Sequence, residues 1–476
     1  MNKDYEVIIV GSGPAGYVAA IRCSQLGLKT LCVEKHGEDG KPSLGGTCLN
    51  VGCIPSKSLL ESSLEFYKAK NTTKEHGIHL EGITLDIKAM QNRKNNVVKG
   101  LTSGVQGLFK LNGVDSLQAE AVVEGEGKVC LKLPDGSEEE FNSKYIIIAT
   151  GSKPKILENI KFDRETIVSS TQSLSFDRVP PSLAIIGAGY IGLELGSIWS
   201  RLGSKVTILE ALEDFLPDVD KQVSDEAFKI LTKQGLDIQL GSKVISAKKE
   251  EAGAQIKYEN ESQELSLASD KLIVATGRDP VTEEVIGPES GIELDEKGFI
   301  KVNAKCETNI HNVFAIGDTV RGPLLAHKAS EEGIMVAENI AGETIQVNYE
   351  HIPSVIYTHP EIAWVGLTEG QALDKGLASN IGVFPFRANG RAMASGDNEG
   401  FVKFMSNQQD NSILGAHVIG PNASEIIQQV VIAMRTKTTV KELTSTVFSH
   451  PSYSESLHEA ALLSEGKAIH ISNRKR

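Results

Sequence analysis

The chain is poor in cysteine and in long apolar runs, and each shortage excludes a class of protein. Six cysteines in 476 residues cannot form the disulfide framework of a secreted domain, so a reducing cytoplasm is the expected compartment. No stretch approaches the ~18 apolar residues that a membrane-spanning helix needs. Acidic residues outnumber basic ones, 62 to 49, and the net charge of −13 argues against nucleic acid and anionic membranes as partners.

The ends of the chain show no targeting pattern. The apolar run Val7–Val10 is too short for the core of a signal peptide and predicts that the first ten residues contain a β-strand. The last three residues, Arg474 to Arg476, are expected to form a solvated basic end.

Glycine, by contrast, is abundant at 45 residues, and it marks two copies of one pattern. In each copy an apolar strand runs into G-x-G-x-x-G and a helical stretch, and a second strand ends in an acid. The acids, Glu34 and Glu210, both lie 23 residues beyond the first glycine (34 − 11 and 210 − 187). The glycines are Gly11, Gly13 and Gly16 in the first copy and Gly187, Gly189 and Gly192 in the second.

This pattern is typical of dinucleotide-binding sites. The first glycine makes a tight turn, the second lets the backbone approach a pyrophosphate, and the third lets helix and strand pack closely. The acid holds a ribose hydroxyl, and the helix N-terminus favours the anion. Two Gly-rich turns without ligands are the alternative. The repeat predicts two dinucleotides in one chain, and therefore electron transfer between them.

The two copies also end alike and suggest the domain organisation. Residues 145–151 read YIIIATG and residues 271–277 read KLIVATG, each after a turn-rich β-meander. A third buried strand, VFAIGD, ends at Asp318, and a long helix is predicted at Ala423–Arg435. We expect an α/β fold with two Rossmann-like nucleotide domains at 1–150 and 151–279, each with a β-meander insertion, a central domain at 280–350 and a C-terminal α+β unit at 351–476.

The second site is predicted to prefer NAD over NADP. Glu210 is followed by Ala211, Leu212, Glu213 and Asp214, with no Arg or Lys to hold a 2′-phosphate. Three carboxylates in this stretch would repel that phosphate.

Two cysteines, Cys48 and Cys53, form a C-x-x-x-x-C pair in a Gly-rich segment. Five residues of regular helix rise about 7.5 Å, whereas a disulfide needs Cα atoms within about 7 Å. A bridge therefore requires a distorted helix start, which Gly52 permits, and Pro55 suits the first turn of the helix that follows. Cys53 at that N-terminus, with Lys57 nearby, should be stabilised as a thiolate.

Three interpretations of the pair remain open. A zinc site would need further ligands, and the other four cysteines form no second close pair. Inert core thiols are the second interpretation. The residues favour the third, a redox disulfide beside the first nucleotide. Cys23 and Cys32 are predicted to be buried small hydrophobic residues.

The segment GGTCLNVGCIPSK, residues 45–57, resembles the pyridine nucleotide–disulfide oxidoreductases. The likeness extends over nearly the whole chain and includes both glycine motifs and VFAIGD. The more specific segments are LLAHKASEEG (324–333), YTHPEIAWVG (357–366), ILGAHVIGP (413–421) and HPSYSES (450–456).

The resemblance implies FAD in the first domain, NAD in the second, a dimerisation domain at 351–476, and homodimers in which that domain completes the partner's active site. For FAD it places Glu34 on the ribose and Asp318 on the ribityl chain. Lys57 is expected beside the flavin, paired with Glu194. Further positions expected at FAD are Ala119, Thr150 and Gly151, those expected at NAD are Glu210, Val244 and Gly277, and Ala326 is expected at FAD or NAD.

His450, followed by Pro451, and Glu455 resemble the family's base and its orienting carboxylate. An alternative for the carboxylate is structural, because Ser452-x-x-Glu455 fits a capping box at a helix start. His359-Pro360 repeats the dipeptide, but its acid is adjacent rather than five residues away.

The implied reaction is FAD-dependent oxidation of a protein-bound dihydrolipoyl group through Cys48 and Cys53, with NAD⁺ as acceptor. The lipoyl group would come from subunits of 2-oxo acid dehydrogenase or glycine cleavage complexes. Ser58, Leu59 and Leu60 provide no charge to match glutathione, and no cysteine follows Cys306 as a mercuric reductase would require. Another disulfide reductase, or a flavin-binding protein without turnover, is the alternative.

Overall fold

The computed structural model describes residues 4–473, so the predicted basic end at Arg474–Arg476 lies outside the described residues. The chain divides into two units, each built from three segments. The first contains the residues up to Leu59, Asp86–Ile156 and Thr276–Val347. The second contains Leu60–Leu85, Leu157–Ala275 and the residues from Asn348 onward.

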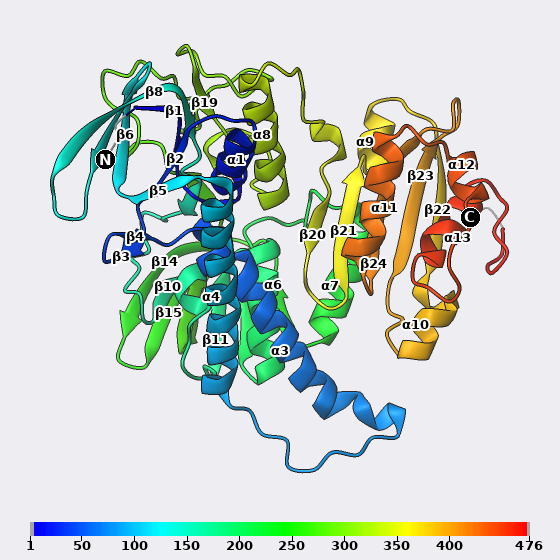
Figure 1. Cartoon of the computed structure of the whole chain (residues 1–476). Helices are drawn as coiled ribbons and strands as arrows, with labels where there is room; N and C mark the ends of the chain where they lie inside the picture. Colours follow the sequence, from blue (N-terminus) through cyan, green and yellow to red (C-terminus); the bar gives the residue numbers. More distant parts are fainter. Residues whose placement is uncertain (1–3, 474–476) are drawn as a thin grey trace. The chain divides into compact units, whose positions relative to one another are not determined.

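The first unit is built on a seven-stranded sheet in which the strands next to the first glycine motif are parallel (Figure 1). The order is β5-β2-β1-β8-β7-β6, with β19 also paired to β8. The strands are β1 (Asp4–Val10), β2 (Thr30–Glu34), β5 (Asp115–Gln118), β6 (Glu120–Gly125), β7 (Lys128–Lys132), β8 (Glu138–Ile148) and β19 (Val313–Ala315). Short pairs are β3 (Gly37–Glu38) with β4 (Lys41–Pro42) and β9 (Ser152–Pro154) with β18 (Arg278–Pro280).

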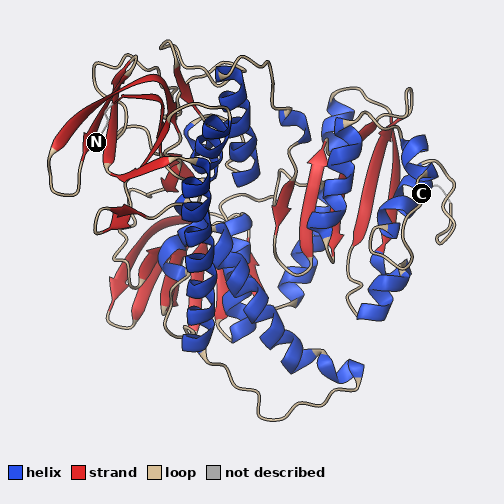
Figure 2. Ribbon diagram, viewed as in Figure 1, coloured by secondary structure: helices blue, strands red, loops and turns tan. Residues whose placement is uncertain are grey.

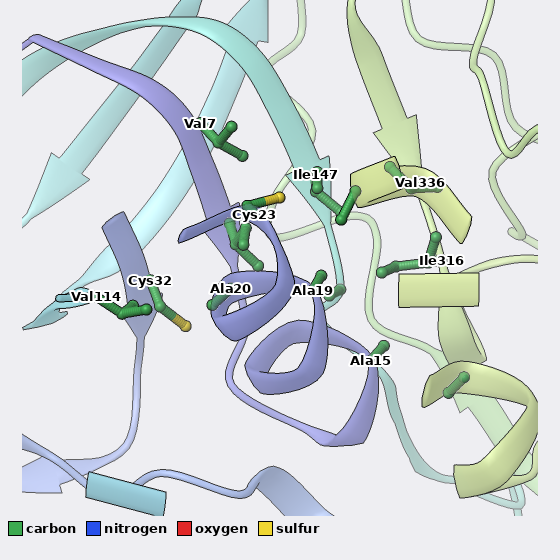
Figure 3. Close-up of a cluster of buried hydrophobic side chains, with 14 of the residues drawn as sticks. Val7, Ala15, Ala19, Ala20, Cys23, Cys32, Val114, Ile147, Ile316 and Val336 are labelled. Atoms are coloured by element: carbon green, nitrogen blue, oxygen red, sulfur yellow. The ribbon is translucent and has the colours of Figure 1, made fainter. Parts of the chain in front are cut away.

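Two helices of the first unit, α1 (Pro14–Gln25) and α8 (Ala326–Ile340), pack closely through small side chains. Ala15 and Ala19 lie in this core beside the strands, as Figure 3 shows. A Cβ on Gly333 would lie 2.7 Å from the Ala15 carbonyl oxygen, so only glycine permits this approach. Cys23 and Cys32 are fully buried in the same core, which confirms that prediction. The other helices are α2 (Gly46–Val51), α4 (Ile87–Asn112) and the start of α3 (Cys53–Asn71).

The second unit contains a parallel sheet, a separate three-stranded meander, and a C-terminal antiparallel sheet. The parallel sheet has the order β10-β17-β11-β12-β13, and the meander is β14-β15-β16. The strands of the parallel sheet and the meander are β10 (Ile167–Ser169), β11 (Ser182–Ile186), β12 (Lys205–Leu209), β13 (Leu236–Gln239), β14 (Lys243–Glu250), β15 (Gly253–Asn260), β16 (Gln263–Ser269) and β17 (Lys271–Val274). Its helices are α5 (Ser170–Ser173), α6 (Tyr190–Leu202) and α7 (Lys221–Lys233).

The C-terminal sheet is wholly antiparallel, with the order β20-β21-β24-β23-β22, and helices pack against it (Figure 2). The strands are β20 (Ser354–Ile356), β21 (Glu361–Gly366), β22 (Ser379–Pro385), β23 (Phe401–Asn407) and β24 (Ile413–Gly420). The helices are α9 (Glu369–Asp374), α10 (Gly390–Ser395), α11 (Ala423–Arg435), α12 (Val440–Ser445) and α13 (Glu455–Ser464).

This architecture confirms the predicted α/β fold with meander insertions and a C-terminal α+β domain. The predicted helix at residues 423–435 also has the bounds of α11. Among residues 4–473, no helix is both long and apolar enough to cross a membrane. The compartment inferred from cysteine usage stays a prediction.

A partly buried histidine in the second unit, His359, affects the stability of the protein in acid. His359 has a side chain that is 26% exposed, and its Nε2 lies 3.6 Å from the Asp397 carboxylate. Burial lowers the pKa of His359 from 6.5 to about 4, and the positive charge of Arg201 adds to this effect.

We expect the free energy of unfolding to decrease as the pH falls from ~6.5 to ~4, because the unfolded chain binds a proton that folded His359 excludes. The contribution is about 3 kcal/mol over that window. Urea unfolding of His359→Gln should show a correspondingly smaller loss on acidification. The exposed His311→Gln variant is the control, and an identical pH dependence in wild type and His359→Gln would contradict the prediction.

Candidate functional site

The first glycine motif has the backbone geometry that a dinucleotide needs. Gly11 has φ +103°, and a Cβ there would lie 2.4 Å from the Ala149 carbonyl oxygen. A Cβ on Gly16 would lie 1.8 Å from the Gly11 carbonyl oxygen, whereas Gly13 faces open space. Gly13 is also the N-cap of α1, and no side chain caps that helix. The turn, the close packing and the open helix N-terminus therefore fit a bound pyrophosphate.

Glu34, at the end of β2, is fixed against this turn. Its Oε2 accepts hydrogen bonds from the Ser12 backbone N–H at 3.1 Å and from the Ser12 hydroxyl at 2.5 Å. Its Oε1 accepts one from the His36 backbone N–H at 3.0 Å. The carboxylate is therefore held at the edge of the turn, where the sequence pattern predicts a ribose hydroxyl.

The second glycine motif repeats this geometry in the second unit. Gly187 has φ +102°, and a Cβ on Gly192 would lie 2.0 Å from the Gly187 carbonyl oxygen. Gly189 again faces open space. Glu210 accepts hydrogen bonds from the Ala188 N–H at 2.7 Å and from the Leu212 N–H at 3.0 Å. Each unit therefore contains one turn with the same acid anchor and the same fit to a dinucleotide.

Asp318 lies in a turn that a buried ion pair holds in place. The Ser152 hydroxyl donates to the Asp318 carboxylate at 2.6 Å. The preceding residue, Gly317, has φ +73°, and its N–H donates to Glu332 at 2.8 Å while its carbonyl oxygen accepts from Lys328 at 2.8 Å. Lys328 and Glu332 are 3.2 Å apart, and both side chains are fully buried.

Sequence reasoning had not singled out Ser152, Lys328 or Glu332. For the ion pair the signal was present, because Lys328 and Glu332 are four residues apart in a helix and therefore lie on the same face. Nothing in the sequence connects Ser152 to Asp318.

The remaining predicted cofactor positions lie mostly at the ends of strands. Ligands of open α/β sheets bind beyond the carboxyl ends of the strands, so this placement is consistent with cofactor binding. Ala119 follows β5, Thr150 and Gly151 follow β8, Gly277 follows β17, Ala326 is the first residue of α8, and Val244 lies in β14. Their contacts with FAD and NAD stay predictions.

The cysteine pair lies where the helix is interrupted, as the C-x-x-x-x-C spacing predicts. Cys48 is in α2 and Cys53 is the first residue of α3, with Pro55 in its first turn. Between them Gly52 leaves helical geometry, with φ −138° and ψ −113°. A Cβ on Gly52 would lie 2.9 Å from the Thr47 carbonyl oxygen. This backbone path therefore favours glycine, which has no Cβ.

The structure contains both cysteines as thiols, and the two are hydrogen-bonded to each other. The hydrogen bond with Cys53 raises the pKa of Cys48 well above its usual range, burial raises it further, and the positive charge of Lys57 acts in the opposite direction. Two thiols coupled in this way lose their protons one after the other, so the pair carries at most one negative charge near neutral pH. This is the arrangement expected of the reduced form of a redox pair.

Lys57 and Glu194 belong to different units, and their predicted pairing stays a prediction. Glu194 is buried in α6, and its carboxylate accepts a hydrogen bond from the Tyr357 backbone N–H at 3.0 Å. Within the first unit, the positive charge of Lys57 acts on the Cys48 thiol and lowers its pKa.

His450 and Glu455 form a pair in the second unit. The His450 Nδ1 and Glu455 Oε1 atoms are 2.8 Å apart. The imidazole is 78% exposed, so Nε2 is left for exchange of a proton with a substrate. Burial acts to raise the pKa of Glu455, but the hydrogen bonds from His450 and from the Ser452 N–H outweigh it, and this pKa lies below its ordinary value. An ionised Glu455 therefore orients the ring through Nδ1.

The capping-box alternative for Glu455 is wrong in its register. Helix α13 begins at Glu455 with Ser454 as its N-cap, so Ser452 does not cap it. The Glu455 carboxylate does accept the Ser452 N–H, at 2.7 Å, through the oxygen that does not contact His450. The carboxylate therefore fixes the turn and the imidazole together.

Comparisons with known proteins match nearly the whole length of the chain. Residues 5–333 match the family described as pyridine nucleotide-disulphide oxidoreductase, and residues 352–461 match the dimerisation domain of that family. The dihydrolipoyl dehydrogenase of Cupriavidus necator is 44% identical over 480 residues, covering 99% of this chain and 100% of the relative. Mitochondrial dihydrolipoyl dehydrogenase 1 of Arabidopsis thaliana is 43% identical over 472 residues, covering 99% and 92%.

A solved structure has the same fold over nearly the whole chain. The Cu(II) complex of the HOCl-induced flavoprotein disulfide reductase RclA from Escherichia coli has a TM-score of 0.86 and is 28% identical. The match covers 97% of this chain and 100% of that one.

The coupling within the cysteine pair can be measured. In the reduced protein, Cys53→Ala should move the midpoint of Cys48 alkylation by iodoacetamide to lower pH, because the Cys53 hydrogen bond is the largest cause of the raised pKa. Lys57→Met should move it to higher pH, because that charge lowers the pKa. Peptide mass spectrometry measures the rate at each pH, and equal midpoints in all three proteins would contradict the prediction.

Proposed function

Because the chain belongs to the pyridine nucleotide–disulphide oxidoreductases, we propose that it oxidises protein-bound dihydrolipoyl groups and passes their electrons to NAD⁺. The observation that carries this proposal is the Cys48–Cys53 dithiol at a helix start, with Lys57 beside it. The full-length likeness to dihydrolipoyl dehydrogenases of two organisms supports the choice of substrate.

The family binds FAD and NAD(P), and both glycine motifs fit such a ligand. We assign FAD to the first motif and NAD to the second. Glu210 and the two acids that follow it, Glu213 and Asp214, would repel the 2′-phosphate of NADP. In the proposed layout the FAD, NAD, central and dimerisation domains are 1–150, 151–279, 280–350 and 351–476.

The chain carries the dimerisation domain of its family and forms a homodimer on that basis. We propose that His450 of one protomer serves the cysteine pair of the other. The lipoyl-bearing subunits of 2-oxo acid dehydrogenase or glycine cleavage complexes are the proposed partners.

The proposed reaction is a thiol–disulfide exchange in which every bond and proton is accounted for. Nε2 of His450 takes the proton of a substrate thiol, and the thiolate attacks Cys48 in the Cys48–Cys53 disulfide. The bond between the two cysteines breaks, and Cys53 leaves as a thiolate stabilised by the helix N-terminus and Lys57. The second substrate thiol gives its proton to the departing Cys48 and attacks the substrate sulfur of the mixed disulfide. The lipoyl disulfide forms, Cys48 is released as a thiol, and the first proton stays on His450.

The exchange leaves the cysteine pair reduced by two electrons. FAD held at the first glycine motif, beside Glu34, would supply the redox chemistry that links the dithiol to hydride transfer to NAD⁺. The residues of the chain orient the ring of His450 through Glu455 and hold one negative charge on the dithiol through Lys57.

One assay separates this function from the alternatives. The purified flavoprotein is tested with dihydrolipoamide plus NAD⁺ or NADP⁺, with NADPH plus glutathione disulfide, and with NADH plus Cu(II). Turnover should be highest with dihydrolipoamide and NAD⁺, and Cys48→Ser should abolish it. Activity confined to glutathione disulfide or to Cu(II) would instead indicate another disulfide reductase or a metal-ion reductase, and no turnover would favour a flavin-binding protein.

His450 has a testable role of its own. His450→Gln should lower kcat with dihydrolipoamide by about 10²–10⁴, the usual contribution of a general base, while the protein keeps its bound flavin. Steady-state kinetics and flavin absorbance measure the two effects. The control is His458→Gln, which removes a histidine one turn into the same helix α13. Wild-type turnover in His450→Gln would exclude this residue as the base.

A further inference from the structure

We propose that Asn50 is a positioning residue that sets the stability of the Cys48–Cys53 disulfide. This inference rests on the redox role proposed for the pair. Asn50 lies between the two cysteines, at the next-to-last position of α2. The proposed reaction gives it no chemical task.

The Asn50 side chain uses both ends of its amide. Its Nδ2 donates to the Leu44 carbonyl oxygen at 3.1 Å and to the Gly46 carbonyl oxygen at 2.9 Å. Its Oδ1 accepts from the Ser43 hydroxyl at 3.2 Å and from the Thr102 hydroxyl at 3.3 Å. Two donors and two acceptor positions are all that an amide side chain offers, so Asn50 is fully engaged.

Helix α2 needs the four hydrogen bonds of Asn50, which we call the brace, because the helix has little stability of its own. It is six residues long, and its N-cap, Gly45, has φ +103° and provides no side-chain cap. Its other end is broken at Gly52. Isolated helices of this length do not persist in water. The side chain of Asn50 ties the end of the helix back to the loop that begins it.

The brace also connects Cys48 to two fixed parts of the first unit. The Gly45 N–H donates to the Ser12 carbonyl oxygen at 3.0 Å. Gly46 is so close to the first glycine motif that a Cβ on it would lie 2.5 Å from the Gly13 Cα. Thr102 lies in the long helix α4. Through Asn50, the helix that carries Cys48 is therefore held between the nucleotide turn and α4.

The stability of an intramolecular disulfide depends on how well each thiol is presented to the other. Holding two groups in a productive geometry raises their effective concentration, and loosening either group lowers it. Cys53 is anchored by the 19-residue helix α3, whereas Cys48 depends on α2. Loss of the brace should therefore weaken the disulfide relative to the dithiol, without removing any atom that reacts.

The experiment measures the dithiol–disulfide equilibrium of the flavoprotein in glutathione buffers. In this equilibrium glutathione disulfide oxidises the pair and is itself reduced to two glutathione molecules, so electrons balance. The fraction of disulfide is read by mass spectrometry after alkylation of the remaining thiols. Asn50→Leu should lower the equilibrium constant for the disulfide about tenfold.

Thr102 supplies a matched pair of variants for the same test. Thr102→Val removes one hydroxyl donor at nearly constant shape and should shift the equilibrium in the same direction by a smaller factor. Thr102→Ser keeps the hydroxyl and should match wild type. If Asn50→Leu does not fold, the difference between the two Thr102 variants decides the question.

The outcomes distinguish this inference from the function on which it rests. If wild type forms the disulfide, but Asn50→Leu and Thr102→Val have wild-type equilibrium constants, Asn50 is not a positioning residue. A loss of thermal stability with an unchanged equilibrium constant leads to the same conclusion. If wild type forms no disulfide even in excess glutathione disulfide, the proposed redox function fails, and this inference fails with it.

Discussion

The structure depends on the contact between backbone atoms inside each glycine turn. In the first motif the third glycine lies so close to the first that a Cβ would overlap the carbonyl oxygen, at 1.8 Å, and the second motif has the same contact at 2.0 Å. This contact brings the start of α1 or α6 against the end of its strand and leaves the helix N-terminus open. The positions of Glu34 and Glu210 follow from it, because both carboxylates bind the residue after the first glycine.

A second constraint is electrostatic and concerns the cysteine pair. A reduced dithiol that stores two electrons must not hold two negative charges in a partly buried site, because each desolvated charge opposes the other. The hydrogen bond between Cys48 and Cys53 keeps the last proton on the pair, while Lys57 favours a single thiolate. The break at Gly52 makes both effects possible, since it brings two cysteines together that a continuous helix would hold about 7.5 Å apart along its axis.

Features with a local cause could be predicted from the sequence, and features that join distant segments could not. Turns, strand ends and the broken helix follow from the spacing of glycines and from Gly52, so the two motifs and the placement of Cys48 and Cys53 were predictable. The contact of Ser152 with Asp318 spans 166 residues and that of Thr102 with Asn50 spans 52. No periodicity in the sequence encodes such contacts. The alternative of a capping box at Ser452 is not formed, because helix α13 begins at Glu455 and its N-cap is Ser454.

The turn at Gly317 shows why the fold keeps a costly buried ion pair. Burying Lys328 and Glu332 opposes folding unless their remaining hydrogen-bonding groups are satisfied. Here the two charges bind the N–H and the carbonyl oxygen of one residue, Gly317, which has a left-handed φ of +73° and begins the short 3₁₀ helix Gly317–Thr319. An apolar pair would leave the Gly317 N–H buried without a partner, which costs about 1–3 kcal/mol, and would leave its carbonyl oxygen with only the Val320 N–H, 3.4 Å away. The Lys328–Glu332 ion pair therefore fixes the direction of the backbone immediately before Asp318. We assign these two charges a structural role rather than a redox role.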